Sequence, residues 1–282
     1  MKPADLTAVM KQVDAFPGFP GSVTRLLRVL DDPEAPMDRI ENILKLDAGL
    51  TANILKLSNS AYFGFQSRIG SVRKAVTLLG ARRLRQLVLA TCLNAFMDRP
   101  IPGYDLPSGE LWRHSIAVSV AAEGLARELA LRNDGEIFTA GLLHDIGKLV
   151  LGGFVRDGLG LIENLTASGL SFEAAERMAL GADHAEVGAR LLGNWSFPAE
   201  LVHAVRWHHE PDRAEEAMLA TDVVHAANTM CMMIGVGIGR DGLKHDISPA
   251  TTRRLGLRPG IVEKVVSQTL QWMNETADAF RA

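Results

Sequence analysis

Apolar side chains recur at three- and four-residue spacing along most of this 282-residue chain. That spacing places them on one face of an α-helix, whereas a half-buried strand would alternate apolar and polar residues. The first hundred residues contain five such segments, at 22–30, 40–46, 50–57, 72–79 and 84–96. Proline and glycine between them, as in PGFPG at 17–21, mark the turns that separate neighbouring helices.

The remainder of the chain continues the helical pattern. It predicts helices at 108–131, 136–151, 198–208, 212–233 and 259–277. A further helix should begin near Asp183, because Asp183 and Glu186 have the spacing of a capping pair at a helix start. The sequence has no sustained alternation of period two, so we predict an all-α fold.

A proline-rich segment, PIPGYDLP at 100–107, is the best candidate for a domain boundary. The charge changes sign around it: residues 1–100 carry 14 Lys and Arg against 9 Asp and Glu, and residues 101–282 carry 16 against 24. The two parts therefore have net charges of +5 and −8. We predict an N-terminal helical bundle at 1–103 and a second helical domain at 104–282.

Basic residues dominate the segment between Asp47 and Asp98, in which no acidic residue occurs. One interpretation is a face that binds phosphates or an acidic partner. The alternatives are a solvated helix face, or a basic face docked on the acidic second half. The basic residues are Lys56, Arg68, Arg73, Lys74, Arg82, Arg83 and Arg85.

Composition places the chain among ordinary globular proteins, with 47% hydrophobic and 22% charged residues. No apolar run approaches the roughly 18 residues that a membrane span requires. The two cysteines, Cys92 and Cys231, lie far apart and suit a reducing compartment. We therefore expect a cytoplasmic protein with no membrane partner.

Five of the eight histidines form an ordered series with two aspartates. Imidazole and carboxylate groups are the usual protein ligands of Zn, Fe, Mn and Ni. Each predicted helix contributes one or two of them, and a helix bundle can aim such ligands at one interior point. We predict that the series binds a divalent transition metal, as one ion or as a di-metal centre. Its members are His114, His144, Asp145, His184, His208, His209 and Asp222.

Asp145 and Lys148, both within HDIGK at 144–148, are the candidate catalytic residues. A carboxylate such as Asp145 can bridge two metal ions that activate a water and clamp a phosphoryl group. Lys148 follows three residues later on nearly the same helix face, where a cation could hold a phosphate. The structural alternatives are a buried pair of His144 and Asp145, packing or helix-end roles for the other histidines, and a solvated Lys148.

The histidine series resembles the HD superfamily of metal-dependent phosphohydrolases, and within it the HD-GYP branch. The HDIGK segment and HHE at 208–210 match that branch's pattern. The chain departs from the pattern at 211–213, where PDR stands in place of Gly-Tyr-Pro, which puts hydrolysis of cyclic di-GMP in doubt. A second HD dipeptide, at 245–246, lies in a polar loop flanked by glycine, and we interpret it as chance.

The N-terminal half resembles the HDOD family instead. The matching segments are DAGLT at 47–51, LSNSAYFG at 57–64, IGSVRKAVTLLG at 69–80, LWRHS at 111–115, AGLLHDIG at 140–147 and HAEVGA at 184–189. The resemblance covers roughly residues 15–230. It implies a two-part helical fold in which the N-terminal bundle packs on an HD-like metal-binding domain.

The HDOD resemblance also implies a bacterial signal-transduction module that regulates through protein or ligand binding. We expect a signalling-protein partner on the N-terminal bundle, and a phosphate-containing compound is a candidate ligand. The retained ligand series leaves open an active metal-dependent phosphohydrolase or phosphodiesterase acting on a nucleotide or another phosphoester. Nucleic acid is a poor candidate partner, because the basic charge lacks an obvious reader helix.

Overall fold

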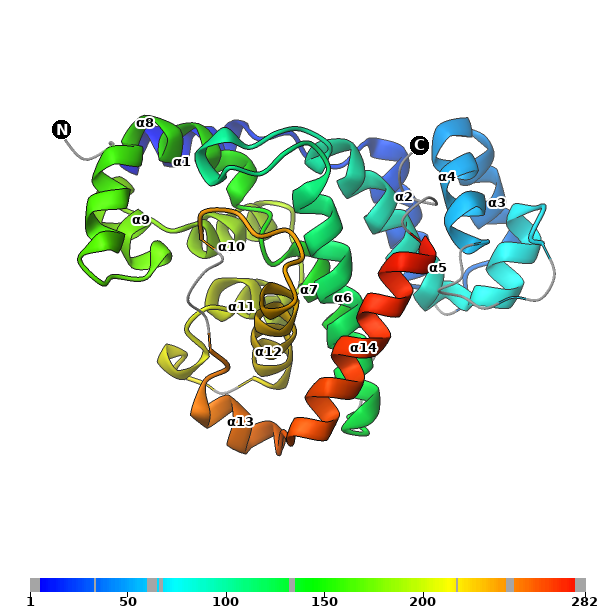
Figure 1. Cartoon of the computed structure of the whole chain (residues 1–282). Coiled ribbons are helices and arrows are strands. Elements are labelled where there is room, and N and C mark those ends of the chain that lie inside the picture. Colours follow the sequence, from blue (N-terminus) through cyan, green and yellow to red (C-terminus); the bar gives the residue numbers. More distant parts are fainter. Residues whose placement is uncertain are drawn as a thin grey trace. The chain divides into compact units, whose positions relative to one another are not determined.

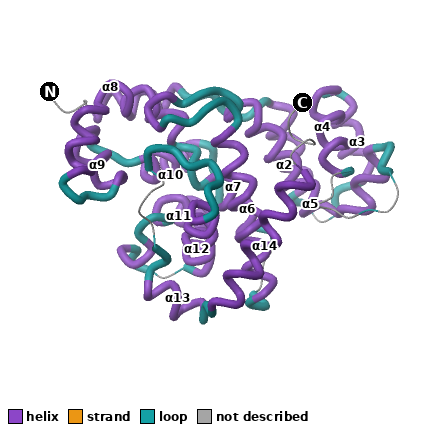
Figure 2. The backbone as a smooth tube through the Cα atoms, viewed as in Figure 1, coloured by secondary structure: helices purple, strands orange, loops and turns teal. Residues whose placement is uncertain are grey.

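The structure, a computed structural model, describes residues 6–32, 34–59, 65, 68–131, 135–216, 218–241 and 246–276. Within these residues every regular element is helical, and the one β-type pairing is an isolated bridge between Ile101 and Leu106 (Figure 2). The predicted all-α fold is therefore confirmed. The end of the 57–64 motif and His245 of the second HD dipeptide lie outside the described residues.

The helices group into two compact units. The larger unit comprises Met1–Pro17 and Phe96–Val266, and the smaller unit comprises Gly18–Ala95 and Ser267–Ala282. The change from one to the other at Ala95–Phe96 lies a few residues before the predicted boundary at 103/104. The first helix groups with the later part of the chain rather than with the helices that follow it.

The smaller unit is built from amphipathic helices around one apolar core. Its helices are α2 (Gly21–Leu30), α3 (Met37–Lys45), α4 (Ala48–Ser58) and most of α5 (Val72–Met97). Leu26, Leu44, Ile54 and Leu84 are fully buried in this core. Gly80 has φ 73° and ψ 170° and interrupts α5, so this element contains the two separate helices that the sequence predicts.

Part of the basic stretch is neutralised within the smaller unit itself. The Arg73 guanidinium lies 2.6 Å from carboxylate oxygens of both Asp38 and Glu41. Arg85 forms an ion pair with Asp31. The pattern of charge in the sequence therefore overstates the positive charge that this unit presents.

The larger unit carries the histidine series. Its helices are α1 (Leu6–Ala15), α6 (Glu110–Glu128), α7 (Glu136–Leu143), α8 (Lys148–Ala167), α9 (Phe172–Leu180), α10 (His184–Asn194), α11 (Ala199–Trp207), α12 (Leu219–Met233), α13 (Pro249–Leu255) and the first part of α14 (Pro259–Thr276). Helices α6, α7 and α12 pack against one another, and α10 pairs with α11 (Figure 1). As predicted, Asp183 caps α10 by accepting a hydrogen bond from the Glu186 amide at 2.6 Å.

The prediction of one helix at 136–151 is wrong. The chain turns between Leu143 and Lys148, so that α7 ends and α8 begins around the HD dipeptide. The turn brings Gly147 against α10, where an added Cβ would lie 1.9 Å from the His184 carbonyl oxygen. Long-range packing, which helical periodicity does not report, thus breaks the helix at this point.

Helix α12 is shorter than predicted, since it begins at Leu219, after a short 3₁₀ turn at Pro211–Arg213. The sequence pattern also missed α1, α9, α13 and the part of α8 beyond residue 151.

The segment Glu136–Ala167 has the length and hydropathy of a membrane span, with a mean hydropathy of 1.3 in its most apolar window. The structure divides the segment between α7 and α8, and 89% of that window is buried inside the protein. Such burial is what a core element shows, so the apolar character of this segment is explained by its place in the larger unit.

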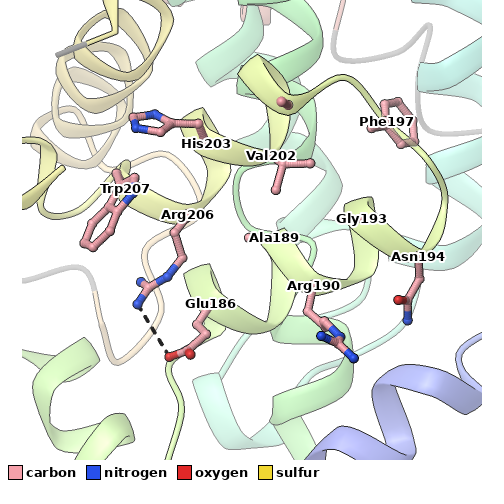
Figure 3. Close-up of a pocket in the computed structure, with 11 residues that line it drawn as sticks. Glu186, Ala189, Arg190, Gly193, Asn194, Phe197, Val202, His203, Arg206 and Trp207 are labelled. Carbon is pink, nitrogen blue, oxygen red and sulfur yellow. Dashed lines mark ion pairs between the residues drawn. The ribbon is translucent and has the colours of Figure 1, made fainter. Parts of the chain in front are cut away.

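Residues of α10 and α11 line an open pocket of about 730 Å³ on the larger unit. Val202, Ala189 and Arg206 are among the residues that line it, and Arg206 lies 3.6 Å from Glu186 (Figure 3). The Arg206 guanidinium also stacks on the Trp207 ring at 4.5 Å. The two helices carry His184 at the start of α10 and His208 just after α11.

Candidate metal centre

Four histidines of the predicted series come from four different elements and converge on Asp145. His114 lies in α6, His144 follows α7, His184 begins α10 and His208 follows α11. All four side chains are buried, and so is Asp145, which lies in the turn between α7 and α8. The sequence prediction that separate helices aim these residues at one interior point agrees with this arrangement.

Each of the four imidazoles is oriented through its Nδ1 atom. The Nδ1 atoms of His144 and His208 lie 2.7 Å from the backbone oxygens of Gly141 and Val205. In the same way, Nδ1 of His114 lies 2.8 Å from the Val236 oxygen, and Nδ1 of His184 lies 2.8 Å from Oε2 of Glu176. An Nδ1–H that donates to an oxygen leaves the Nε2 lone pair for a metal, as in most histidine-ligated metal sites. His114 differs from the others in that its Nε2 also lies 3.0 Å from Oδ1 of Asn228.

The Nε2 atoms surround the Asp145 carboxylate at similar distances. His184 and His208 place Nε2 at 3.4 and 3.7 Å from Oδ1 of Asp145. His144 and His114 place Nε2 at 3.3 and 3.7 Å from Oδ2. Ligands bonded at about 2.0–2.1 Å to a tetrahedral ion lie roughly 3.3–3.4 Å from one another. The donor atoms are therefore already close to the spacing that a bound metal requires.

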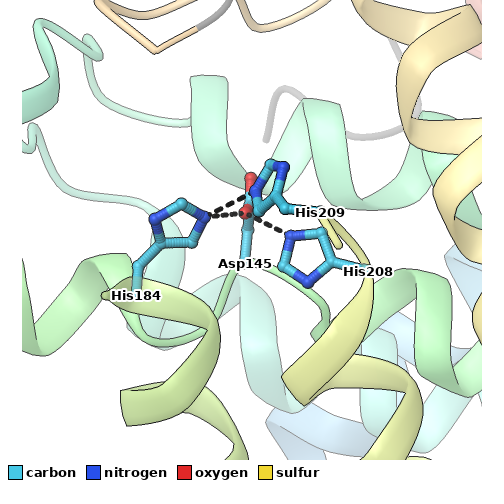
Figure 4. A group of neighbouring side chains, drawn as sticks. All are labelled: Asp145, His184, His208 and His209. Carbon is cyan, nitrogen blue, oxygen red and sulfur yellow. Dashed lines mark hydrogen bonds and ion pairs between the residues drawn. The ribbon is translucent and has the colours of Figure 1, made fainter. Parts of the chain in front are cut away.

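These donors form two groups that share Asp145. The first comprises Asp145, His184, His208 and His209 (Figure 4), and the second comprises His114, His144 and Asp145. His209 joins the first group through its Nε2, which lies 2.8 Å from Nε2 of His184. The arrangement gives each oxygen of Asp145 its own set of imidazoles, as a carboxylate that bridges two ions needs.

Several of the converging atoms make no hydrogen bond within the described residues. They are Nε2 of His144, Nε2 of His208 and Oδ1 of Asp145. Buried polar atoms are almost always paired, because an unpaired one costs about 1–3 kcal/mol. Three atoms that can coordinate a metal and lack a hydrogen bond surround one point, as expected where a cation binds. The residues present therefore fit a transition metal.

Burial and neighbouring charges set the protonation of the cluster. Burial lowers the pKa of His144 to about 4, so this imidazole is neutral at pH 7. Burial also disfavours the charged form of His184, but the Glu176 carboxylate outweighs it and raises the His184 pKa well above 6.5. Burial alone would raise the pKa of Asp145, but the neighbouring His144 side chain and the Lys148 ammonium hold it well below its usual value.

Lys148 is buried beside Asp145, as its i,i+3 spacing predicts, and is not a solvated lysine. Its Nζ lies 2.6 Å from Oδ2 of Asp145 and 2.5 Å from Oδ2 of Asp241. Burial disfavours the charged ammonium, but the two carboxylates together raise its pKa. The ammonium is therefore held by two anionic groups, one of which the sequence did not suggest.

Asp222 is the one member of the predicted ligand series that the structure does not bring to the cluster. Its Oδ1 and Oδ2 accept hydrogen bonds of 2.5 and 2.6 Å from the Arg254 guanidinium, and Oδ1 also accepts one of 2.6 Å from Thr251. These bonds join α12 to α13. Asn228, six residues later on α12, faces the cluster instead, with its Oδ1 3.0 Å from Nε2 of His114.

Sequence reasoning missed Glu176, Asn228 and Asp241. Glu176 is fully buried on the apolar face of α9, where it accepts hydrogen bonds from both the backbone and side chain of His184 and from Tyr104. A polar residue on the apolar face of a helix is a usable signal, which both Glu176 and Asn228 carry. Asp241 lies in a glycine-rich loop and offers no comparable signal.

The comparisons with known proteins agree with this fold. The HDOD domain family model matches residues 16–211. A solved structure from Shewanella amazonensis SB2B, described provisionally as a phosphohydrolase, is 26% identical, with a TM-score of 0.76 over 97% of this chain and 98% of that one. An HDOD domain protein of unknown function from Geobacter sulfurreducens is 24% identical, with a TM-score of 0.71 over 98% and 95%.

Two curated relatives match over shorter shares of their own length. An uncharacterized Treponema pallidum protein is 26% identical over 213 residues, which are 74% of this chain and 40% of that protein. Ribonuclease Y of Thermus thermophilus is 33% identical over 120 residues, which are 41% of this chain and 16% of the enzyme. The family match covers more than half of the sequence, and the chain belongs to the HDOD domain family.

Proposed function

We propose that this chain is a regulatory HDOD module of signal transduction, and that its larger unit holds a divalent transition metal at Asp145. The observation that carries the proposal is the arrangement of the four imidazoles. Each has Nδ1 at an oxygen acceptor and Nε2 within 3.3–3.7 Å of the Asp145 carboxylate. Such an arrangement is typical of metal ligands and has no evident use in plain helix packing.

The first donor group is the better metal site. His184, His208 and His209 would hold an ion together with Oδ1 of Asp145. The second group competes with other contacts, because Oδ2 of Asp145 already accepts a hydrogen bond from Lys148. A bound transition metal would supply a Lewis acid that polarises a water or a phosphoryl oxygen.

Burial favours a regulatory role over an open catalytic site. Structural metal sites are closed by their ligands, whereas catalytic sites keep one position open to substrate. Asp145, His184 and His208 are each at most 1% exposed. Lys148, the group that would hold a substrate phosphate, is at the same time engaged by Asp241.

A metal-dependent phosphohydrolase is the second candidate, and one specific observation favours it. Asp145 presents one oxygen to each of two donor groups, which suits two ions held by a bridging carboxylate. Lys148 would stabilise the charge of a phosphoester at that position. The description of the Shewanella relative as a provisional phosphohydrolase agrees with this candidate.

Metal content and hydrolysis, measured together, test the proposal. We expect near-stoichiometric metal in the tag-free protein by mass spectrometry, loss of that metal in Asp145→Ala, and retention in the surface control Asp157→Ala. We expect no turnover of bis(p-nitrophenyl) phosphate or p-nitrophenyl phosphate by the metal-loaded protein. If the native protein hydrolyses either compound and Asp145→Ala does not, the enzymatic role replaces the regulatory one. A native protein that takes up no metal would contradict both roles.

The smaller unit is the proposed partner-binding part of this module. Lys74 and Arg82 are exposed on α5, and they would meet acidic groups of a signalling protein. Charge reversal at Arg82 and Arg83 should then weaken capture of that partner without changing metal content. Unchanged capture would show that the basic stretch is not the docking surface.

A further inference from the structure

The loop that follows α12 lies against the candidate metal centre. We call residues 235–241 the strap. Near its start, the Val236 carbonyl accepts the Nδ1–H of His114 at 2.8 Å. At its end, Asp241 places Oδ2 2.5 Å from Nζ of Lys148. The strap therefore contacts both an imidazole of the centre and the cation beside it.

The strap fits its place closely at two glycines. A Cβ added at Gly237 would lie 2.5 Å from Cβ of His114, and one added at Gly239 would lie 2.4 Å from the Tyr104 carbonyl oxygen. Only glycine tolerates such approaches. The backbone amide of Arg240 also donates to the Tyr104 oxygen at 2.9 Å. These contacts hold the strap closely against the centre.

Asp241 is a buried carboxylate, at 7% exposure, and forms an ion pair with Lys148. A carboxylate is removed from water at considerable cost unless a positive group pairs with it. Here the same ammonium also pairs with Asp145 at 2.6 Å. One cation thus holds two carboxylates, and the repulsion between them opposes the attraction of Asp241 to Lys148.

An anion that reaches Lys148 would have to displace one of these carboxylates. Asp145 lies in the short turn between two buried helices and is surrounded by four imidazoles. Asp241 lies at the end of the strap, outside any helix. Asp241 is the carboxylate that can leave without dismantling the donor groups.

We propose that Asp241 is the resident anion of a phosphate-binding site on Lys148, and that inorganic phosphate or a phosphomonoester exchanges with it. Exchange frees the end of the strap and, through Val236, loosens the contact that orients His114. A phosphate carries about −1.5 to −2 charges, so it compensates the ammonium more fully than one carboxylate does. The inference rests on the proposed regulatory function and supplies the ligand class of that same centre.

Two substitutions release the strap in different ways. Asp241→Asn keeps the shape of the side chain and removes its charge. Gly237→Ala keeps the charge and forces the strap away from His114. Gly235→Ala is the matched control, because this glycine also has a positive φ, 79° against 63° at Gly237, but an added Cβ would have Ile238 as its nearest neighbour at 4.0 Å.

Binding of inorganic phosphate, measured by titration calorimetry beside metal content, tests the inference. We expect Asp241→Asn and Gly237→Ala to bind phosphate about tenfold or more tighter than the native protein, the equivalent of about 1.4 kcal/mol. Gly235→Ala should bind it like the native protein. Equal affinity in all four proteins, or no binding in any of them, would overturn the inference.

The metal content separates this failure from a failure of the proposed function. Full metal with unchanged phosphate affinity would overturn the role of Asp241 alone. Absence of metal from the purified native protein would overturn the metal centre itself. If Asp241→Asn fails to fold, the comparison of Gly237→Ala with Gly235→Ala still decides the outcome.

Discussion

Gly147 lies where the turn after Asp145 meets the start of α10, and replacing it with alanine should separate the two. An added Cβ would lie 1.9 Å from the His184 carbonyl oxygen and 2.7 Å from the Gly188 amide nitrogen. Both atoms belong to the backbone, so no side chain can rotate away. The φ of Gly147 is −64°, which alanine adopts freely, so the expected effect is steric and not conformational.

The size of the effect follows from these distances. Ordinary van der Waals contact begins at 3.4 Å, so the His184 backbone must retreat by about 1.5 Å. Overpacking of this kind lowers the free energy of unfolding by about 1–3 kcal/mol, and a backbone clash belongs at the upper end. The same retreat carries Nε2 of His184 away from Asp145, which it now approaches at 3.4 Å. Metal retention should therefore fall together with stability.

Denaturant unfolding and metal content, measured side by side, check this prediction. The matched control is Gly153→Ala on α8, where an added Cβ meets nothing within 4 Å. That exposed helical position should gain about 0.5–1 kcal/mol from the change and keep its metal. If Gly147→Ala matched Gly153→Ala in stability and metal content, the close approach of the turn to α10 would be refuted.

Three further predictions concern the groups around the centre. Glu176→Gln should weaken metal affinity about 10–100-fold, because Glu176 orients His184 through a 2.8 Å contact, and competition with a chelator measures the loss. In metal-free protein the raised pKa of His184 adds to the free energy of unfolding. This contribution is complete below pH 6.5 and is lost as the pH rises through the pKa that His184 has in the folded state. Denaturant unfolding between pH 6 and pH 9 should show that decline in the native protein and not in Glu176→Gln, and a decline of equal size in both would contradict the assignment. Asp222→Asn should lower the free energy of unfolding by about 1–3 kcal/mol through the lost Arg254 bonds, yet leave metal content unchanged, and loss of metal would return Asp222 to the ligand set.

The sequence predicted most of the fold because most helices here are amphipathic. The helices predicted at 22–30, 40–46 and 50–57 begin and end within about three residues of α2, α3 and α4. Prediction failed where tertiary contacts override the local pattern. The 136–151 segment is largely apolar, so nothing in its periodicity reports the turn that the packing of Gly147 on α10 imposes.

Residue chemistry grouped His114, His144, Asp145 and His184, because imidazole and carboxylate groups on several helices are the usual ligands of a transition metal. It was insufficient for Asp222, since a carboxylate on the expected helix can serve an ion pair as well as a metal. The deciding partner, Arg254, lies 32 residues further along the chain. No spacing rule connects positions so far apart, and the same holds for the pairing of Lys148 with Asp241.

Anomalous diffraction at the absorption edge of the metal found in the purified protein tests the central claim most directly. The account predicts a peak about 2.0–2.2 Å from Oδ1 of Asp145 and from Nε2 of both His184 and His208. A peak at another place, or none in crystals of protein with stoichiometric metal, would contradict the assignment of this centre.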